Sequence, residues 1–314
     1  LRLGASMILF VCSLTIVPMG HAIGEARAPL TLLAFGDMPC GPADLPAFEA
    51  LLQAFNDTPH DITLHVRDIK GGGSPCSDEV FTQQRDYLNP VAGPLVYVPG
   101  DNEWTDCHRK SAGQYDPLER PAFLRQTFFV PGRSLGQTPL TIGQQAQAGP
   151  PFEILIENAR WQQGGVRFVT AHVVGSNNGL NPKDPAAVAE YHVRDDANIV
   201  RIGNSFAMAR DEQAMAVVLV IHGDPFLQYG IGGGFIRTIN AIAEGAAAFG
   251  GPVLLIHGDG HEYTIDTPFQ TQQGQVLENV FRLEVPGAAD MRAVRVRIDP
   301  DAPTMFAFEA FGPN

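Results

Sequence analysis

Basic residues are scarce in this chain. Its 314 residues include 21 lysines and arginines against 34 aspartates and glutamates, a formal net charge of -13 at pH 7. Proteins that bind extended nucleic acids rely on many basic side chains to neutralise phosphates, so we expect no nucleic-acid surface. An acidic protein can still bind a small phosphate compound where metal ions reverse the local field.

Charged residues of either sign are also few, at 18% of the chain, whereas hydrophobic residues make up 45%. This balance argues against disorder, and the length allows one large α/β domain or two smaller ones. The sequence contains no internal repeat and no run of like charge. The composition therefore predicts a globular protein.

Long apolar runs are nearly absent, apart from one at about residues 7–17. This run is too short to be a good transmembrane span, and a small-x-small site follows it at residues 20–22. We therefore predict a signal peptide over residues 1–22 and a mature domain over 28–314, located in the periplasm or secreted. No stable membrane association is expected after cleavage; an uncleaved anchor is the alternative.

Cysteine is rare as well, with four residues in total. Cys12 lies in the predicted signal peptide, which leaves Cys40, Cys76 and Cys107 in the mature chain. In an oxidising compartment two of the three would be expected to pair. Because Cys76 and Cys107 both follow strand ends that carry polar residues, we predict a disulfide between them. Cys40 is then free or buried, or it is an alternative partner.

Apolar segments typical of strands alternate with segments of helical spacing, which indicates a layered α/β fold. The predicted strands are 30–35, 62–66, 95–98, 166–171, 216–221, 253–256, 280–285 and 293–298. The predicted helices are 46–55, 77–88, 185–213 and 233–249. Apolar and polar residues alternate at the end of the chain, so the last two strands are predicted to form an edge hairpin with one solvated face.

Acidic residues follow the first three predicted strands directly. Asp37, Asp68 and Asp101 are spaced by 31 and 33 residues (68 − 37 and 101 − 68), about one strand–helix–strand unit. Parallel strands joined by right-handed crossovers bring their carboxyl ends to one edge of a sheet. We therefore expect these carboxylates to meet there. Three residues that follow later strands are expected at the same edge: His222, Asp259 and His261.

Several carboxylates cannot share a small space as bare anions, so protons or bound cations must relieve the repulsion. With histidine nitrogens beside them, two divalent metal ions that share a bridging carboxylate are the economical solution. The sequence therefore predicts a centre with two divalent ions. The candidate ions are Mn, Fe, Mg, Ca and Zn.

This order of motifs resembles the calcineurin-like metallophosphoesterase superfamily, whose usual pattern is D-x-H, G-D, G-N-H-[DE], H and G-H-x-H. The matching segments, within about residues 30–265, are Asp37-Met38-Pro39, Arg67-Asp68, Gly100-Asp101-Asn102-Glu103, His222 and Gly258-Asp259-Gly260-His261. The resemblance implies two mixed β-sheets packed as a sandwich flanked by helices. It also implies metal ligation by Asp37, Asp68, Asp101, His222, Asp259 and His261, with Asp68 as the bridging ligand.

The chain departs from the family pattern at several positions. Pro39 stands where the family has a ligand His, whereas Asp101 and Asp259 replace a ligand Asn and a ligand His. These exchanges shift the predicted site toward hard oxygen ligands. Asn102 occupies the position of the His that usually assists catalysis. An amide can donate a hydrogen bond to a phosphate oxygen, but it cannot deliver a proton near neutral pH.

Other residues have weaker assignments. His172 or His257 could supply the missing catalytic His, although a purely structural role fits each equally well. Glu103 is expected to orient the site through hydrogen bonds, as neighbours of metal ligands often do. Asn178 and Lys70 could contact substrate, but for Lys70 an ordinary glycine turn is the simpler interpretation.

Two short motifs lack the context that would give them a function. Residues 132–136 match G-x-S-x-G, the nucleophile motif of many hydrolases, but they lie within the Pro/Gly/Gln-rich loop 131–151, and no helix pattern follows them. Residues 230–234 are rich in glycine, but they do not directly follow a strand as a dinucleotide-binding loop would.

The resemblance implies an exported hydrolase of phosphoric mono- or diesters, in which a metal-bound hydroxide attacks a small phosphate-ester substrate. The alternative is a catalytically impaired protein of the same fold that acts as a secreted binding or scaffold protein. Its support is the loss of the family's ligand and catalytic histidines at Pro39 and Asn102. A serine hydrolase that acts through Ser134 is a third hypothesis.

Overall fold

The structure is a computed structural model that describes residues 28–66, 68–226 and 233–313. The predicted signal peptide, residues 1–22, and Arg67 lie outside these ranges. Within them, no helix combines the length and the apolar character that crossing a membrane requires.

The first sheet contains five strands: β1 (Leu30–Phe35), β2 (Ile62–His65), β3 (Leu95–Tyr97), β11 (Ala293–Ile298) and β12 (Phe306–Phe311). Their order across the sheet is β12-β11-β1-β2-β3. β1, β2 and β3 run parallel, whereas β11 is antiparallel to both of its neighbours. The three parallel strands therefore end at one edge of the sheet, as predicted.

The second sheet contains seven strands: β4 (Gly143–Gln144), β5 (Ala159–Gln163), β6 (Val166–Thr170), β7 (Ala216–Val220), β8 (Val253–His257), β9 (Thr264–Asp266) and β10 (Val280–Glu284). Their order is β4-β5-β6-β7-β8-β10-β9. The central strands β6, β7, β8 and β10 are parallel, and the outer ones pair antiparallel. This sheet also presents several carboxyl ends at one edge.

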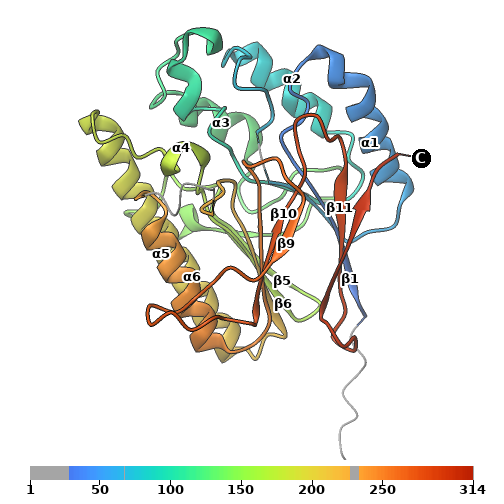
Figure 1. Cartoon of the computed structure of the whole chain (residues 1–314). Coiled ribbons are helices and arrows are strands. Elements are labelled where there is room, and N and C mark those ends of the chain that lie inside the picture. The colour runs from blue at the N-terminus through green and yellow to red at the C-terminus, as the bar shows by residue number, and fades with distance from the viewer. Residues whose placement is uncertain (1–27, 67, 227–232, 314) are drawn as a thin grey trace, which may run out of the picture.

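Helices cover the outer faces of both sheets (Figure 1). The α-helices are α1 (Leu45–Asp57), α2 (Asp78–Leu88), α3 (Arg120–Phe128), α4 (Gly175–Asn178), α5 (Pro185–Asp211) and α6 (Ile236–Phe249). Short 3-10 turns are η1 (Pro42–Asp44), η2 (Thr105–His108), η3 (Lys110–Ala112) and η4 (Gln145–Ala148). α1, α2 and α3 pack on the first sheet, and α5 and α6 pack on the second.

The core between the sheets follows from the alternation of side chains along the strands. In β1, Leu32 faces the second sheet, where it joins a buried cluster with Phe168 and Val218. Leu33 and Phe35 point the opposite way and pack under the helices of the first sheet. Each fully buried side chain of this size contributes roughly 1.5–3 kcal/mol. The result is a four-layer α-β-β-α sandwich, which confirms the predicted fold class.

The predicted hairpin of 280–285 and 293–298 is wrong. β10 lies in the second sheet between β8 and β9, whereas β11 lies in the first sheet between β1 and β12. The hairpin at the sheet edge is formed by β11 and β12 instead. Alternation indicates one solvated face, but it does not specify which sheet a strand joins. Strands β4, β5, β9 and β12 have no counterpart in the sequence prediction.

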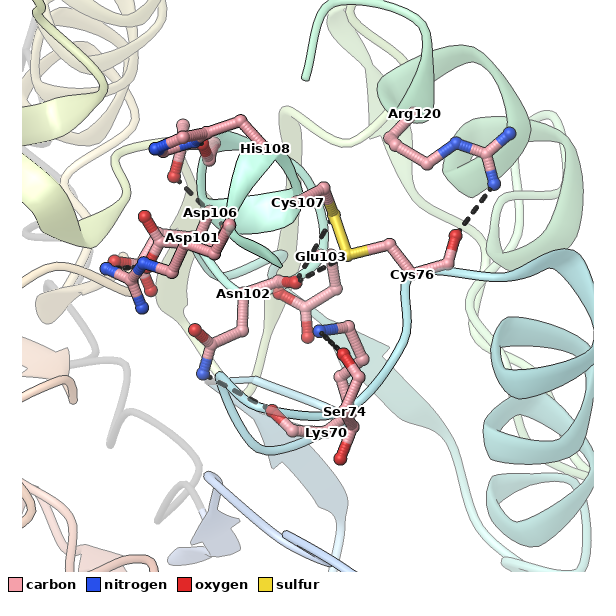
Figure 2. Close-up of a disulfide and its surroundings, with 12 residues drawn as sticks. Lys70, Ser74, Cys76, Asp101, Asn102, Glu103, Asp106, Cys107, His108 and Arg120 are labelled. Atoms are coloured by element: carbon pink, nitrogen blue, oxygen red, sulfur yellow. Dashed lines mark hydrogen bonds and ion pairs between the residues drawn. A yellow bond between two sulfur atoms is a disulfide. The ribbon is translucent and has the colours of Figure 1, made fainter. Parts of the chain in front are cut away.

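A disulfide joins Cys76 to Cys107, as predicted, with 5.7 Å between their Cα atoms (Figure 2). It links the segment after β2 to η2, which follows β3. The two sulfur atoms lie 3.4 and 3.6 Å from the carbonyl oxygen of Asn102. Cys40 is a free thiol, half-buried, and it donates a hydrogen bond to the carbonyl of Asp37 at 3.2 Å. The disulfide therefore braces the loop that carries Asp101 and Asn102.

Candidate metal centre

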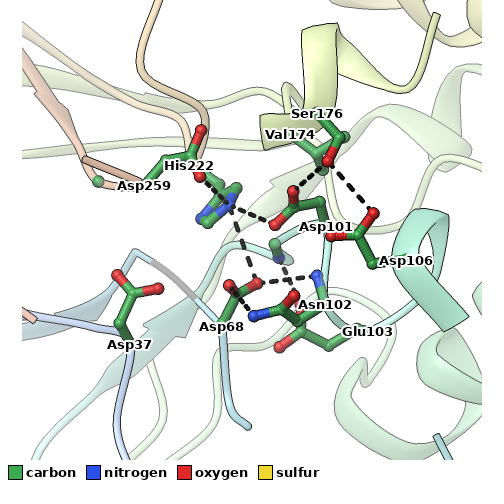
Figure 3. A network of polar contacts seen from close by, with 12 residues as sticks. Asp37, Asp68, Asp101, Asn102, Glu103, Asp106, Val174, Ser176, His222 and Asp259 are labelled. Carbon is green, nitrogen blue, oxygen red and sulfur yellow. Dashed lines mark hydrogen bonds and ion pairs between the residues drawn. The ribbon is translucent and has the colours of Figure 1, made fainter. Parts of the chain in front are cut away.

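Strand ends from both sheets meet at one rim (Figure 3). Asp37, Asp68 and Asp101 follow β1, β2 and β3 of the first sheet, and His222 and Asp259 follow β7 and β8 of the second. In the close-up, dashed lines join His222 to Asp68, Asp101 and Asp259. Residues separated by up to 259 − 37 = 222 positions are thus brought to one place.

The centre of the group is formed by Asp68, Asp101 and His222, whose ligand atoms all lie within 4.8 Å of one another. His222 Nε2 is 3.3 Å from Asp101 Oδ1 and 3.8 Å from Asp68 Oδ1. Asp259 Oδ1 lies 3.9 Å from the same nitrogen. Asp68, Asp101 and His222 are buried. Three carboxylates therefore lie within 3.9 Å of one imidazole nitrogen.

Asp37 and His261 form the outer part of the group. His261 Nε2 lies 3.3 Å from Asp37 Oδ1, and its side chain is 47% exposed, whereas Asp37 is buried. Asp37, Asp259 and His261 have φ angles of 50°, 74° and 64°, in the left-handed region. Such conformations cost non-glycine residues on the order of 1–3 kcal/mol each, and they concentrate at functional sites. The rim is therefore held in a strained backbone arrangement.

The electrostatics of the inner group are unfavourable without a cation. Burial raises the pKa of Asp68 well above its usual value, and the charges of Glu103, Asp101 and Asp37 add to this rise. Burial also raises the pKa of Asp259. Although burial opposes it, the carboxylates raise the pKa of His222 to about 9, mainly through its hydrogen bond to Asp101. The group thus retains protons that a divalent ion would replace.

Two glycines allow the backbone to approach the carboxylates closely. A Cβ atom on Gly100 would lie 1.8 Å from Asp68 Oδ1, and one on Gly175 would lie 2.7 Å from oxygens of Asp101 and Asp259. Together, the convergent carboxylates, the imidazole nitrogen and the close backbone fit a divalent metal ion. The donor set is rich in oxygen, as the sequence predicts.

Glu103 and Asn102 hold Asp68 in place. Glu103 is fully buried and accepts hydrogen bonds from the backbone N–H of Gly100, at 2.9 Å, and of Ile69. Asn102 donates to Asp68 twice, from its backbone N–H at 3.1 Å and from its side-chain amide at 2.6 Å. The Asn102 amide therefore orients a candidate ligand in this conformation. The orienting role expected of Glu103 stays a prediction.

His172 belongs to a separate buried group. Its Nδ1 lies 2.7 Å from Glu157 Oε1, and Glu157 also forms an ion pair with Arg125 at 2.6 Å. Burial lowers the pKa of His172, although Glu157 opposes this effect. His257 is buried at the end of β8, with its Nδ1 3.0 Å from the Gly258 carbonyl. Neither residue is part of the group of Asp68, Asp101 and His222.

Asn178 and Lys70 turn inward rather than toward a substrate. Asn178 is fully buried; its amide accepts from Val174 N–H and Arg194 and donates to the Gly234 carbonyl. Lys70 is 2% exposed, and its ammonium group donates to the Ser74 carbonyl at 3.0 Å. Both polar groups are engaged within the protein, which argues against the predicted substrate contacts.

Ser176 and Asp106 are functional candidates that the motifs do not include. Ser176 Oγ donates to Asp101 Oδ2 at 2.8 Å and lies 3.2 Å from Asp106 Oδ1. Ser176 lies in α4, where it and the next two residues have left-handed φ angles of 52°, 58° and 55°. A glycine followed by Ser-Asn-Asn is the sequence signal for such a turn, because Gly and Asn tolerate this region. Burial, followed by the charge of Asp101, raises the pKa of Asp106 to about 6.

Two more buried carboxylates, Asp224 and Glu284, lie beside the Asp259 turn. Asp224 donates its backbone N–H to Asp259 Oδ2 at 3.4 Å, and a Cβ on Gly260 would lie 2.4 Å from Glu284 Oε1. They extend the acidic rim toward β10. Neither residue belongs to the five motifs that predict the site.

Comparison with known proteins gives little further information. No family model matches the chain, and no curated protein matches it. Among solved structures, it is similar to a crystal structure described as a novel phosphatase from Mycoplasma pneumoniae, with 9% identity and a TM-score of 0.43. The match covers 91% of this chain and 93% of that one. A likeness at this level carries no conclusion about activity, so the family resemblance stays a prediction.

Proposed function

We propose that this protein is a metal-dependent phosphoesterase that hydrolyses small phosphate esters. One observation carries the proposal: Asp68, Asp101 and His222, from two sheets, place their ligand atoms within 4.8 Å of one another in a buried site. The order of the five motifs, which resembles that of the calcineurin-like metallophosphoesterases, supports the reaction class. The disulfide fits an oxidising compartment and thus supports export to the periplasm or the medium.

Asp68, Asp101, His222 and Asp259 would hold one divalent ion firmly, and Asp37 and His261 would hold a second more loosely. Bound ions of this kind polarise a phosphoryl oxygen and lower the pKa of a water molecule. His222 must lose its extra proton to act as a ligand, so metal binding is expected to release protons. The chain itself supplies the ligand positions and excludes water from the buried face of the site.

Asn102 cannot transfer a proton, since an amide does not titrate near neutral pH. In this conformation its amide hydrogen bonds to Asp68 Oδ2 at 2.6 Å. We therefore infer that the leaving alcohol receives no proton from Asn102. Esters of acidic alcohols should be hydrolysed faster than alkyl esters.

The test combines metal content with turnover. Purified protein is analysed by mass spectrometry for bound metals and assayed with p-nitrophenyl phosphate and bis(p-nitrophenyl) phosphate. Asp68→Asn should lower kcat/KM by at least about 100-fold, because even residues that only support a ligand are worth 10- to 100-fold. Asp196→Asn, an exchange at an exposed residue paired with Arg237, is the control and should have no effect.

Unchanged turnover in Asp68→Asn at full metal occupancy would refute the proposed role. Bound metal without turnover of either ester would instead favour the second candidate, a secreted binding or scaffold protein. That candidate is supported by Asn102, which stands where the family has its catalytic His.

A further inference from the structure

A cavity of about 490 Å³ adjoins the candidate metal centre. Its wall includes Ser176 and Asp106, and Ser176 is hydrogen bonded to the candidate ligand Asp101 at 2.8 Å. The remaining wall comes from η2, residues 116–118, the segment after α4 and the first turns of α5. Ser176 therefore lies between the candidate ligand Asp101 and this cavity.

Carboxylates dominate the charged groups of the wall: Asp106, Asp116, Asp184 and Glu190. No lysine or arginine lines it, and His108 is the one basic side chain among its described residues. Arg109 pairs with Asp106 at 2.6 Å, and Arg194 pairs with Glu190 at 2.7 Å.

Asp116 and Asp184 have no such cationic partner in the part of the chain that the structure describes. Asp116 accepts from the backbone N–H of Leu118 at 2.9 Å, and Asp184 accepts from that of Ala186, also at 2.9 Å. These two carboxylates leave the cavity with net negative charge.

The rest of the wall is largely apolar. Leu118, Leu180 and Pro117 line it, together with Trp104, which is 2% exposed. The Trp104 indole N–H is buried and has no hydrogen-bond partner among the described residues. The Arg194 guanidinium already lies over the Trp104 ring, 5.0 Å from its centroid, so the apolar surface left for a ligand is mainly aliphatic. An aliphatic surface beside carboxylates is suited to a cation with an apolar body, such as an alkylated ammonium group.

We propose that this acidic cavity selects the alcohol part of the substrate and favours an alcohol that carries an ammonium group. The inference rests on the proposed phosphoesterase function. Hydrolysis of such an ester forms a P–O bond to water and breaks the P–O bond to the alcohol. A proton from water goes to the alcohol oxygen, so that the amino alcohol and phosphate leave. Alcohols that carry a carboxylate or a second phosphate are repelled by the wall.

Three alkyl phosphates with similar chains test the preference. They are choline phosphate, its uncharged isostere 3,3-dimethylbutyl phosphate, and 3-carboxypropyl phosphate. We expect kcat/KM for phosphate release to fall in that order. In the Asp116→Asn/Asp184→Asn variant, the ratio of kcat/KM for choline phosphate to that for the uncharged ester should fall about 10-fold. A larger change is not expected, because both carboxylates are exposed to solvent and screened. Asn also caps helices, so α5 keeps its N-terminal cap.

Asp196→Asn, on the same helix but outside the cavity, should leave the ratio unchanged. A second measurement does not depend on turnover: binding of choline alone, followed by calorimetry, should weaken in the double variant. If Asp68→Asn removes turnover of all three esters but the charge on the ester makes no difference, the cavity proposal is overturned and the phosphoesterase stands. If no ester is hydrolysed yet choline binding depends on Asp116 and Asp184, the phosphoesterase fails and the cation site stands. Absence of both effects overturns both.

Discussion

Replacing Gly100 with alanine should empty the metal centre, although Gly100 is not itself a candidate ligand. The added Cβ would lie 1.8 Å from Asp68 Oδ1 and 2.9 Å from Glu103 Oε2. An ordinary contact begins at 3.4 Å, so the Asp68 oxygen has to move by 3.4 − 1.8 = 1.6 Å. Such a shift breaks its 3.1 Å hydrogen bond from Asn102 N–H and displaces it from His222. Overpacking of this kind costs about 1–3 kcal/mol.

Two measurements check this prediction: metal content by mass spectrometry, and urea unfolding with and without added Mn²⁺. An ion present at 100 times its dissociation constant stabilises a folded protein by about 2.7 kcal/mol, and Gly100→Ala should lose this increment. The matched control is Gly203→Ala on the exposed face of α5, where nothing lies within 4 Å of the new Cβ. It should raise stability by about 0.5–1 kcal/mol and leave metal binding intact. A Gly100→Ala protein with full metal content and normal turnover would show that the close approach to Asp68 is not needed.

Three further predictions concern the scaffold. Loss of the disulfide in a Cys76→Ser/Cys107→Ser variant should cost about 3–4 kcal/mol in urea unfolding, because the bridge closes a loop with a sequence separation of 31; an unchanged midpoint would contradict this. Burial alone would raise the pKa of Glu157, but Arg125 holds this pKa below its usual value of 4.5. The ion pair therefore stabilises the folded protein above pH 4.5, and this contribution is lost as the pH falls further below that value. Glu157→Gln should thus be less stable by roughly 2–3 kcal/mol at pH 7, with a gap from wild type that narrows below pH 4.5 in acid-unfolding curves. Ser77→Ala removes the side chain that accepts from Val80 N–H at the start of α2 and should cost about 1 kcal/mol, seen as a lower Tm.

The sequence was sufficient to predict the part of the site whose position follows from the order of the parallel strands. Asp37, Asp68 and Asp101 follow three parallel strands joined by helical crossovers, and that connectivity forces their ends to one edge. The disulfide could be anticipated for a related reason, since Cys76 and Cys107 lie on segments that follow neighbouring strands of that sheet. Both predictions depend on order along the chain rather than on packing.

Other features depend on how the two sheets and their loops pack, which no local pattern encodes. Ser176 reaches Asp101 only because a run of left-handed residues turns it toward the first sheet. Lys70 follows a strand as the acids do, but its side chain turns back into its own loop. The partner of β11 could not be inferred, because one solvated face is compatible with either sheet.

The candidate ligands are divided between the two sheets, with Asp37, Asp68 and Asp101 on one and His222, Asp259 and His261 on the other. A nascent chain cannot form this group before residue 261 has left the ribosome and the halves of the sandwich have docked. The ions available where folding finishes, rather than those where translation occurs, would then determine which metal the protein carries.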